Sequence, residues 1–363
     1  MAFRLRCGPQ SKPLSKGLLL FSKQRVLSAS LLAAISPVLF AGTAHATDTG
    51  LFGSVNDGAG AYSQSMAIIG ITETTEAAPV SSVKWLVNQQ CPDGSFMLYR
   101  AAGEKCTAPD PLNYTGPDTN TTAVAVVALL NSGKVKQAKK AGNSLLAWQN
   151  ADGGFPYFGG GESDVNSSGL VTYALQRLTP TKKLTKVITA ADTFIGVTVL
   201  PCTDPVTERY GLPFQPGATA DSMASAQGLL GLAPLSANAG KPAKSVKNVN
   251  CDSDVTKQIS SYLERSAKAN SWSLPNSWVP GEIDWSATST AVVSLAEAGW
   301  SPKGISKMTS ALEANVNKVI KKKGVLLPGS IGLLMQAATS AGKNPMSFGG
   351  KNLYSLLLST LTK

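Results

Sequence analysis

A motif that starts with an aspartate and continues as a long apolar stretch recurs along this chain. Five copies align, and each has a small residue four positions after the aspartate and an aliphatic residue eleven positions after it. Aspartate accepts hydrogen bonds from the first N–H groups of a helix, and its charge suits the positive end of the helix dipole. The motif therefore predicts helices that begin at Asp57, Asp118, Asp164, Asp221 and Asp284, with a degenerate sixth copy from Pro328.

These six segments are apolar or small on nearly every side, which is typical of helices buried inside a protein. Segments with one charged side and one apolar side stand between them, and we expect these to be helices with one face in water. The expected outer helices cover residues 81–90, 135–149, 182–197, 255–269, 306–320 and 351–361.

Buried and half-exposed helices thus alternate six times, with a repeat length of about 45 to 63 residues. Such helical hairpins either stack as an open solenoid or close into a ring. Six copies without evident terminal caps favour closure. The sequence therefore predicts an all-α fold, an α/α toroid (α6/α6 barrel), formed by one domain over residues 47–363. The aspartates at the starts of the inner helices would then face one mouth of the barrel.

A short phrase at the end of one outer segment, WQNADGGF from Trp148 to Phe155, has a counterpart in QCPDGSF from Gln90 to Phe96. Both resemble the QW-type repeats of the terpenoid cyclase and protein prenyltransferase superfamily, which includes squalene cyclases and the helical domain of transcobalamin-like proteins. The resemblance implies an α/α toroid. We interpret the phrase as a structural joint. Its glutamine would bind backbone groups at the helix end, its glycine would allow a positive φ, and its phenylalanine would enter the core.

The motifs that carry chemistry in that superfamily are missing from this chain. The D-x-D-D acid of the triterpene cyclases and the G-C-G-E-Q motif of the thioester proteins do not occur. The protein prenyltransferases hold zinc with Asp, Cys and His, whereas the one histidine here, His45, lies in a segment that we expect to be removed. A Ser-His-Asp triad and a His-ligated zinc site are thereby excluded. We predict no catalytic residue, no metal site and no cofactor.

Residues 1–46 have the features of a signal peptide. A basic start is followed by an apolar run at 26–40, too short for a comfortable membrane span, and by Ala44-His45-Ala46 as a cleavage site. Removal of its six basic residues would lower the formal net charge from +11 to about +5. We expect a secreted protein with Gram-positive-type export and no stable membrane anchor. The remaining positive charge lacks the arginines and aromatics of a nucleic-acid surface, so no nucleic-acid partner is expected.

Four cysteines follow the predicted signal peptide. An even number in an exported chain indicates two disulfides. Of the three possible pairings, Cys91–Cys106 and Cys202–Cys251 close the shortest loops and are favoured. A zinc site built from all four thiolates is the alternative, but no C-x-x-C spacing supports it.

Paired acids precede two of the predicted inner helices at the same spacing, as Glu162 with Asp164 and Glu282 with Asp284. The same loops carry aromatic residues, and a concave site with aromatics and a few polar groups is the usual form of a ligand pocket. Helix capping and plugging of the barrel end are the structural alternatives for these residues. The predicted ligand-binding residues are Asp118, Tyr157, Glu162, Asp164, Asp221, Trp278, Glu282, Asp284 and Trp285.

Three functions fit these observations. The first is a non-catalytic binding module for a small molecule, with a corrinoid as the ligand that the transcobalamin-like resemblance implies. A separate β-domain protein or a transporter would then be its partner. The second is a carboxylate-dependent enzyme acting on a glycan or an isoprenoid, with Asp164 and Asp284 on opposite sides of the substrate. The third is a structural surface protein.

Overall fold

The computed structural model describes residues 49–363 except residue 102 and residues 235–243. The predicted signal peptide at 1–46 lies outside the described residues, so the domain limits at 46 and 47 stay predictions. The described part is mostly helical, with two small antiparallel sheets. β1 (Phe155–Pro156) pairs with β2 (Ser163–Asp164), and β3 (Lys321–Lys322) pairs with β4 (Val325–Leu326).

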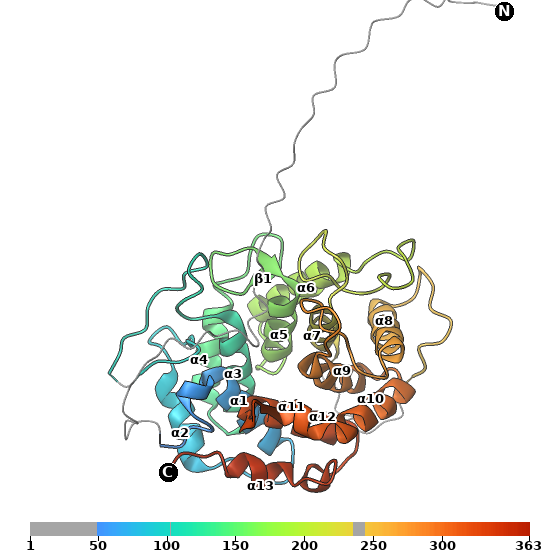
Figure 1. Ribbon diagram of the computed structural model, residues 1–363. Coiled ribbons are helices and arrows are strands. Elements are labelled where there is room, and N and C mark those ends of the chain that lie inside the picture. Colours follow the sequence, from blue (N-terminus) through green and yellow to red (C-terminus); the bar gives the residue numbers. More distant parts are fainter. Residues whose placement is uncertain (1–48, 102, 235–243) are drawn as a thin grey trace, which may run out of the picture. The chain divides into compact units, whose positions relative to one another are not determined.

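Six inner helices form a closed ring (Figure 1). Each contacts the next in chain order, and the last contacts the first. Backbone hydrogen bonds from Gly50 N to Thr362 O (2.9 Å) and from Thr362 N to Leu51 O (2.8 Å) join the two ends of the described chain. The predicted α/α toroid is confirmed. The inner helices are α1 (Ala61–Thr72), α3 (Thr119–Asn131), α5 (Val165–Leu175), α7 (Ser222–Leu232), α9 (Trp285–Ala298) and α12 (Pro328–Ser340).

The outer helices alternate with the inner ones, and each packs against the inner helix of its own hairpin. The predicted helix at 306–320 is divided at Asn315, whose Nδ2 donates to Ala311 O at 2.9 Å. Such a side-chain bond to the backbone competes with the helical pattern. The outer set is α2 (Val80–Gln89), α4 (Val135–Leu145), α6 (Lys182–Val197), α8 (Val255–Ala269), α10 (Pro302–Ala314), α11 (Val316–Ile320) and α13 (Leu353–Leu358). Two short 3₁₀ turns, η1 (Val55–Asp57) and η2 (Pro345–Ser347), complete the elements.

The prediction that Asp57 begins the first inner helix is wrong. Asp57 lies in η1, and α1 starts at Ala61 after Gly60. The first N–H of α1, on Ala61, donates to Leu98 O at 2.6 Å, so a loop carbonyl stands close to this helix end. A Cβ on Gly60 would lie 2.3 Å from that same oxygen. Glycine is therefore required at the position that the other copies give to aspartate.

A side-chain oxygen in the first turn of five inner helices holds the preceding loop. It accepts the backbone N–H of a fully buried apolar residue, at 2.8 to 3.0 Å. The accepting residue stands four positions after the helix N-cap, which explains why small hydroxyl residues recur at that position. The pairs are Phe52 with Gln64, Phe96 with Thr122, Phe155 with Ser168, Leu212 with Ser225 and Leu274 with Thr288.

Small residues let neighbouring inner helices touch along their backbones. A Cβ added to Gly70 of α1 would lie 2.3 Å from Gly332 O of α12, and one added to Gly169 of α5 would lie 2.2 Å from Gln227 O of α7. Both distances are far inside van der Waals contact. The ring is therefore closed by helices that approach more tightly than a side chain would permit.

The repeated phrase is a joint, as its sequence predicts. Gln149 Nε2 donates to Gly153 O and to Val187 O of α6, both at 2.8 Å, and so ties the turn to the next outer helix. Gln90 does the same at its own turn, with bonds to Gly94 O and to Gln137 O of α4. Gly94 and Gly153 have φ of 104° and 90°. The phenylalanines Phe96 and Phe155 are fully buried.

Both predicted disulfides are present. Cys91 is bonded to Cys106, and Cys202 is bonded to Cys251. Among the residues described, none of the helices combines the length and apolar character needed to span a bilayer. The disulfides agree with export, which itself stays a prediction.

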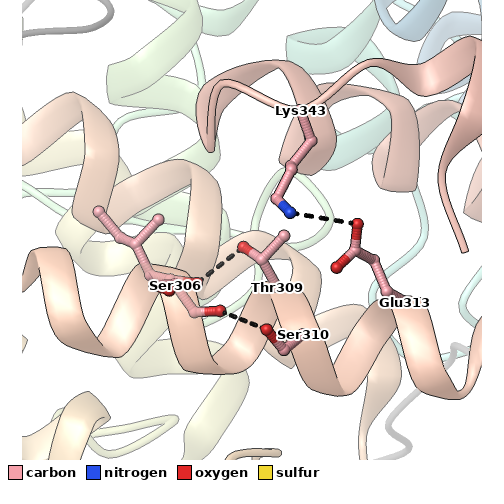
Figure 2. Close-up of polar contacts among 6 residues, drawn as sticks. Ser306, Thr309, Ser310, Glu313 and Lys343 are labelled. Carbon is pink, nitrogen blue, oxygen red and sulfur yellow. Dashed lines mark hydrogen bonds and ion pairs between the residues drawn. The ribbon is translucent and has the colours of Figure 1, made fainter.

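Hydroxyl side chains of the outer helices also bond along their own backbone, as α10 illustrates. Figure 2 shows Thr309 and Ser310 donating to the carbonyl oxygens of Ile305 and Ser306, at 2.7 and 3.1 Å. Lys343, just after α12, forms an ion pair of 3.5 Å with Glu313. Exposed pairs of this kind contribute at most about 1 kcal/mol to stability. The ring is therefore held mainly by its core and by the buried loop contacts.

Substitution of Ser168 by alanine should lower the free energy of unfolding by about 1–3 kcal/mol, because the buried N–H of Phe155 loses its acceptor. Urea unfolding followed by circular dichroism measures the change. Ser310→Ala is the matched control, since its hydroxyl is exposed and bonds only along its own helix. We expect that variant to stay within ~0.5 kcal/mol of the parent. Equal effects of the two substitutions would contradict this role for the hydroxyl.

Candidate functional site

Four aspartates cap inner helices at the same mouth of the ring. Each places Oδ1 2.7 to 2.8 Å from a backbone N–H three residues ahead. This confirms the predicted caps at Asp118 (α3), Asp164 (α5), Asp221 (α7) and Asp284 (α9).

Burial dominates the chemistry of these carboxyl groups. Asp118 and Asp164 are 1% and 2% exposed. Removal from water penalises the charged form and raises the pKa of each to about 7, although capping hydrogen bonds partly offset the effect. The pKa of Asp221 is also raised by burial, and that of Asp284 is raised by burial and by the nearby charge of Asp221. At neutral pH the mouth therefore holds carboxyls that are partly protonated.

Two tyrosines lie beside the first pair of aspartates. Burial, with a further contribution from Asp118, raises the pKa of Tyr62 to about 12. The pKa of Tyr157 is raised by burial and then by Asp118, Tyr62 and Asp164. The loop after β1 holds Tyr157 in place, because Thr119 N of α3 donates to Tyr157 O at 2.9 Å. The structure thus brings Asp118, Tyr157 and Asp164 together, and it adds Tyr62, which the sequence analysis missed.

The paired acids are separated by the fold. Asp164 and Asp284 are turned into helix caps, whereas Glu162 and Glu282 are exposed. Glu162 lines an open depression of about 630 Å³ together with Asp152 and Gln215. Glu162 and Glu282 therefore lie in solvent around the mouth and are not part of the buried cluster of aspartates.

The aromatic residues form two groups. Tyr114 and Tyr157 both meet Phe158 edge to face, with ring centroids 6.0 and 4.5 Å apart. On the other side Phe214 meets Trp278 edge to face at 5.8 Å, and Trp278 is 41% exposed. Trp285 is half-buried at the start of α9. Apart from Trp285, which is in α9, these rings belong to loops that precede inner helices.

One stripe of each inner helix faces the axis of the ring. The residues two, six, nine and thirteen positions after the N-cap lie on one face of a helix. The buried side chains at positions six and nine retain a relative solvent exposure of 1–9%. The residues between them, such as Ala67 and Ile68, have none. We call this set the axial stripe. Counted from the N-cap, its four positions form four layers. The second layer contains Met66, Val124, Leu170, Gln227, Thr290 and Leu333, and the third contains Ile69, Val127, Tyr173, Leu230, Val293 and Gln336; we call these two the middle layers.

A contact across the ring places the last layer of the stripe toward the axis. Arg177, after α5, forms an ion pair of 3.8 Å with Glu297 of α9, although α7 stands between those helices in the ring. The guanidinium carbon of Arg177 also lies 3.5 Å from the ring centre of Tyr173. The axis therefore has a charged end here and an acidic, tyrosine-rich end at the mouth.

Several buried polar atoms of the inner helices have no hydrogen-bond partner among the described residues. Asn166 Oδ1 lies in the first turn of α5, in the first layer of the axial stripe. Ser222 Oγ lies in the first turn of α7. Gln336 Nε2 lies in the third layer. Within the described residues no group of three acidic, cysteine or histidine side chains is arranged to hold a metal ion.

No family model matches this sequence, and no curated protein matches it. Solved structures match the fold. A variant of the type II terpene cyclase MstE from Scytonema, in complex with merosterolic acid A, has a TM-score of 0.50 and 10% identity over 78% of this chain and 87% of its own. A variant of Rex8A from Paenibacillus barcinonensis, complexed with xylose, has a TM-score of 0.50 and 13% identity over 81% and 84%.

A third similar structure is ent-copalyl diphosphate synthase from Streptomyces platensis. It has a TM-score of 0.51 and 12% identity, over 78% of this chain and 50% of the synthase. The three structures share the α/α toroid with this chain, as the sequence resemblance implies. Identities this low establish the fold alone.

The raised pKa values at the mouth give a testable pH dependence. Both values near 7 lie above the ~3.9 of an aspartate in an unfolded chain, so the folded protein binds extra protons between those limits. Their contribution to stability is therefore fully present below pH 4 and is lost as the pH rises through about 7. Asp118→Asn should remove up to ~1.4 kcal/mol per pH unit of this slope and keep the cap.

Urea unfolding at pH 4.5, 5.5 and 7 measures the slope. Asp57→Asn, at an exposed site outside the ring of caps, should leave the slope of the parent protein unchanged. An Asp118→Asn variant with the parent's slope would show that this carboxyl does not take up a proton in the folded state.

Proposed function

We propose that this chain is a ligand-binding toroid that takes an amphipathic small molecule at the aspartate mouth. The apolar part of the ligand would enter along the axial stripe, and its polar part would stay among the caps and tyrosines. One observation carries the proposal: the middle layers of the stripe keep residual exposure on a mostly apolar surface, between two polar ends. An apolar cavity with a few placed polar groups is the usual form of a small-molecule site.

The polar groups of the mouth fit an uncharged oxygen-bearing ligand. With pKa values near 7, Asp118 and Asp164 offer an O–H donor in their protonated form. Asn166 Oδ1 is a buried acceptor without a protein partner. Donors and an acceptor at one place would bind a hydroxyl or carbonyl group. An anionic ligand would instead meet the remaining negative charge of the caps.

The apolar axis favours a terpenoid-like ligand over a sugar. The similar structures hold one ligand of each kind, merosterolic acid A in the MstE variant and xylose in the Rex8A variant. Sugars need many hydrogen-bond partners, whereas in the two middle layers only Gln227, Thr290 and Gln336 carry an amide or aliphatic hydroxyl group. A corrinoid, which is much wider, would have to lie across the mouth, against Trp278, Trp285 and the exposed Glu162 and Glu282. A partner β-domain protein or transporter belongs to that version of the proposal.

A carboxylate-dependent enzyme is the second candidate. A carboxyl group with a pKa near 7 is suited to donate a proton at neutral pH, which is the requirement for a general acid. Asp118 and Asp164 both meet this condition beside Tyr157. The substrate would be an isoprenoid or a glycan that enters by the same mouth.

Val124→Phe should abolish ligand binding, because the larger ring fills the axis at its second layer. The parent protein is titrated with farnesol, geranylgeraniol, cobalamin and xylotetraose, and binding is followed by native mass spectrometry and tryptophan fluorescence. Val197→Phe, at a position 76% exposed on α6, is the matched control and should bind like the parent. Circular dichroism confirms that both variants fold. Binding of an isoprenoid alcohol that Val124→Phe leaves unchanged would contradict an axial site, and binding of none of the four probes would favour a structural role.

Turnover separates the enzyme from the binding module. The same probes, together with polyprenyl diphosphates and cell-wall polysaccharide, are incubated with the parent protein and analysed for products. Loss of product in Asp118→Asn, Asp164→Asn or Asp284→Asn would establish the carboxylate enzyme. Binding without product is the result expected for the binding module.

A further inference from the structure

Charged residues from the second half of the sequence line a further cavity. The cavity has a volume of about 280 Å³ and lies against α8 and the segment that follows α6. The disulfide Cys202–Cys251 joins two segments that supply its walls. Its polar residues include Arg209, Glu264, Arg265 and Lys268.

Neither of the two arginines forms an ion pair with a carboxylate of the described residues. Among the described residues the ion pairs are Arg177–Glu297 and Lys343–Glu313, and neither contains Arg209 or Arg265. The undescribed residues 235–243 contain no acid in their sequence. Arg265 donates through Nη2 to the backbone oxygen of Arg209 at 2.7 Å, which holds the two residues together.

Each guanidinium also keeps a buried donor unused. The Nε atoms of Arg209 and Arg265 are inaccessible to solvent and have no hydrogen-bond partner among the described residues. Buried polar groups are nearly always satisfied, since an unmade hydrogen bond to a charged group is costly. Burial and the neighbouring charge of Arg209 lower the pKa of Arg265, so the pair is electrostatically unfavourable as it stands.

The surrounding residues shape the cavity for one small ligand. Tyr262 and Tyr210 flank the arginines, with guanidinium carbons 5.8 and 5.9 Å from the ring centres. Glu264 also lines the cavity, but Ser301 Oγ donates a short hydrogen bond to its carboxylate. Lys268, one turn along α8 from Glu264, adds a third positive charge.

We propose that this cavity binds a tetrahedral oxyanion, a phosphate or sulfate group. Two guanidinium groups and an ammonium group would share one dianion, which removes the repulsion between the arginines. The group could be a free inorganic anion or the phosphodiester of an anionic polymer. The site uses none of the residues assigned to ligand binding at the aspartate mouth, so it stands or fails independently of the function proposed above.

Binding is measured on the purified full chain by isothermal titration calorimetry and thermal shift. Inorganic phosphate and sulfate are the probes, chloride at matched ionic strength is the reference, and poly(glycerol phosphate) tests the polymer source. We expect phosphate to bind and to raise Tm above the chloride reference. Binding of the polymer much more tightly than of phosphate would identify the phosphodiester as the ligand, and equal or weaker binding would identify the free anion.

Four variants test the assignment of residues. Arg209→Gln and Arg265→Gln should each weaken phosphate binding at least tenfold. Glu264→Gln removes the opposing charge and should strengthen it. Lys186→Gln, which removes an exposed charge on α6, should bind like the parent and controls for net charge. Should an arginine variant fail to fold, stronger binding in Glu264→Gln together with unchanged binding in Lys186→Gln still decides the question.

The proposal is overturned if phosphate stabilises the parent no more than chloride does. It is also overturned if Arg265→Gln and Lys186→Gln respond to phosphate alike, since binding would then reflect net charge and not this cavity.

Discussion

The hydrogen bond between an inner helix and its preceding loop, present in five of the six described hairpins, positions the loops of the mouth. In five hairpins an oxygen in the first helical turn accepts the N–H of a fully buried loop residue, such as Phe155 on Ser168. The loop that carries Tyr157 and the capping residue Asp164 are thus both bound to the first turn of α5. A site assembled from loops becomes as rigid as the helices beneath it. Preorganisation of this kind lowers the entropic cost of ligand binding.

The two ends of the barrel differ because all inner helices run in the same direction. Their positive dipole ends meet at one mouth, and there the chain places four capping aspartates. Their negative ends meet at the other, where Arg177 lies. Burial works against the dipoles at the mouth, since it raises the pKa of Asp118 and Asp164 to about 7. The balance between these effects makes the mouth a place where protons can be exchanged at neutral pH.

Local patterns in the sequence were enough to predict the fold. Periodicity and capping depend on neighbouring residues, so the alternation of helices and the caps at Asp118 and Asp164 could be predicted. The disulfide pairing could be predicted because it closes the shortest loops. The alignment chose Asp57 wrongly because the true N-cap, Gly60, must be glycine to avoid the carbonyl of Leu98, which lies in another segment. That shift of three positions also hid the axial stripe, in which Tyr62 aligns with Asn166. The pairs Arg177–Glu297 and Arg209–Arg265 join residues from different helices and loops, and no local pattern brings them together.

Closure of the ring has a consequence for the order in which the chain can fold. Helix α12 packs on α1, and the strand-like contact of Phe52 with Leu361 joins segments from the two ends of the described chain. A solenoid of the same hairpins could grow from either end, one neighbour at a time. In the ring, α1 and α12 gain their second inner-helix neighbour only when the last hairpin packs against the first. The final contact spans nearly the whole sequence and carries its full loop-closure entropy. The ring should therefore mature late, only after the last hairpin is available to pack against the first.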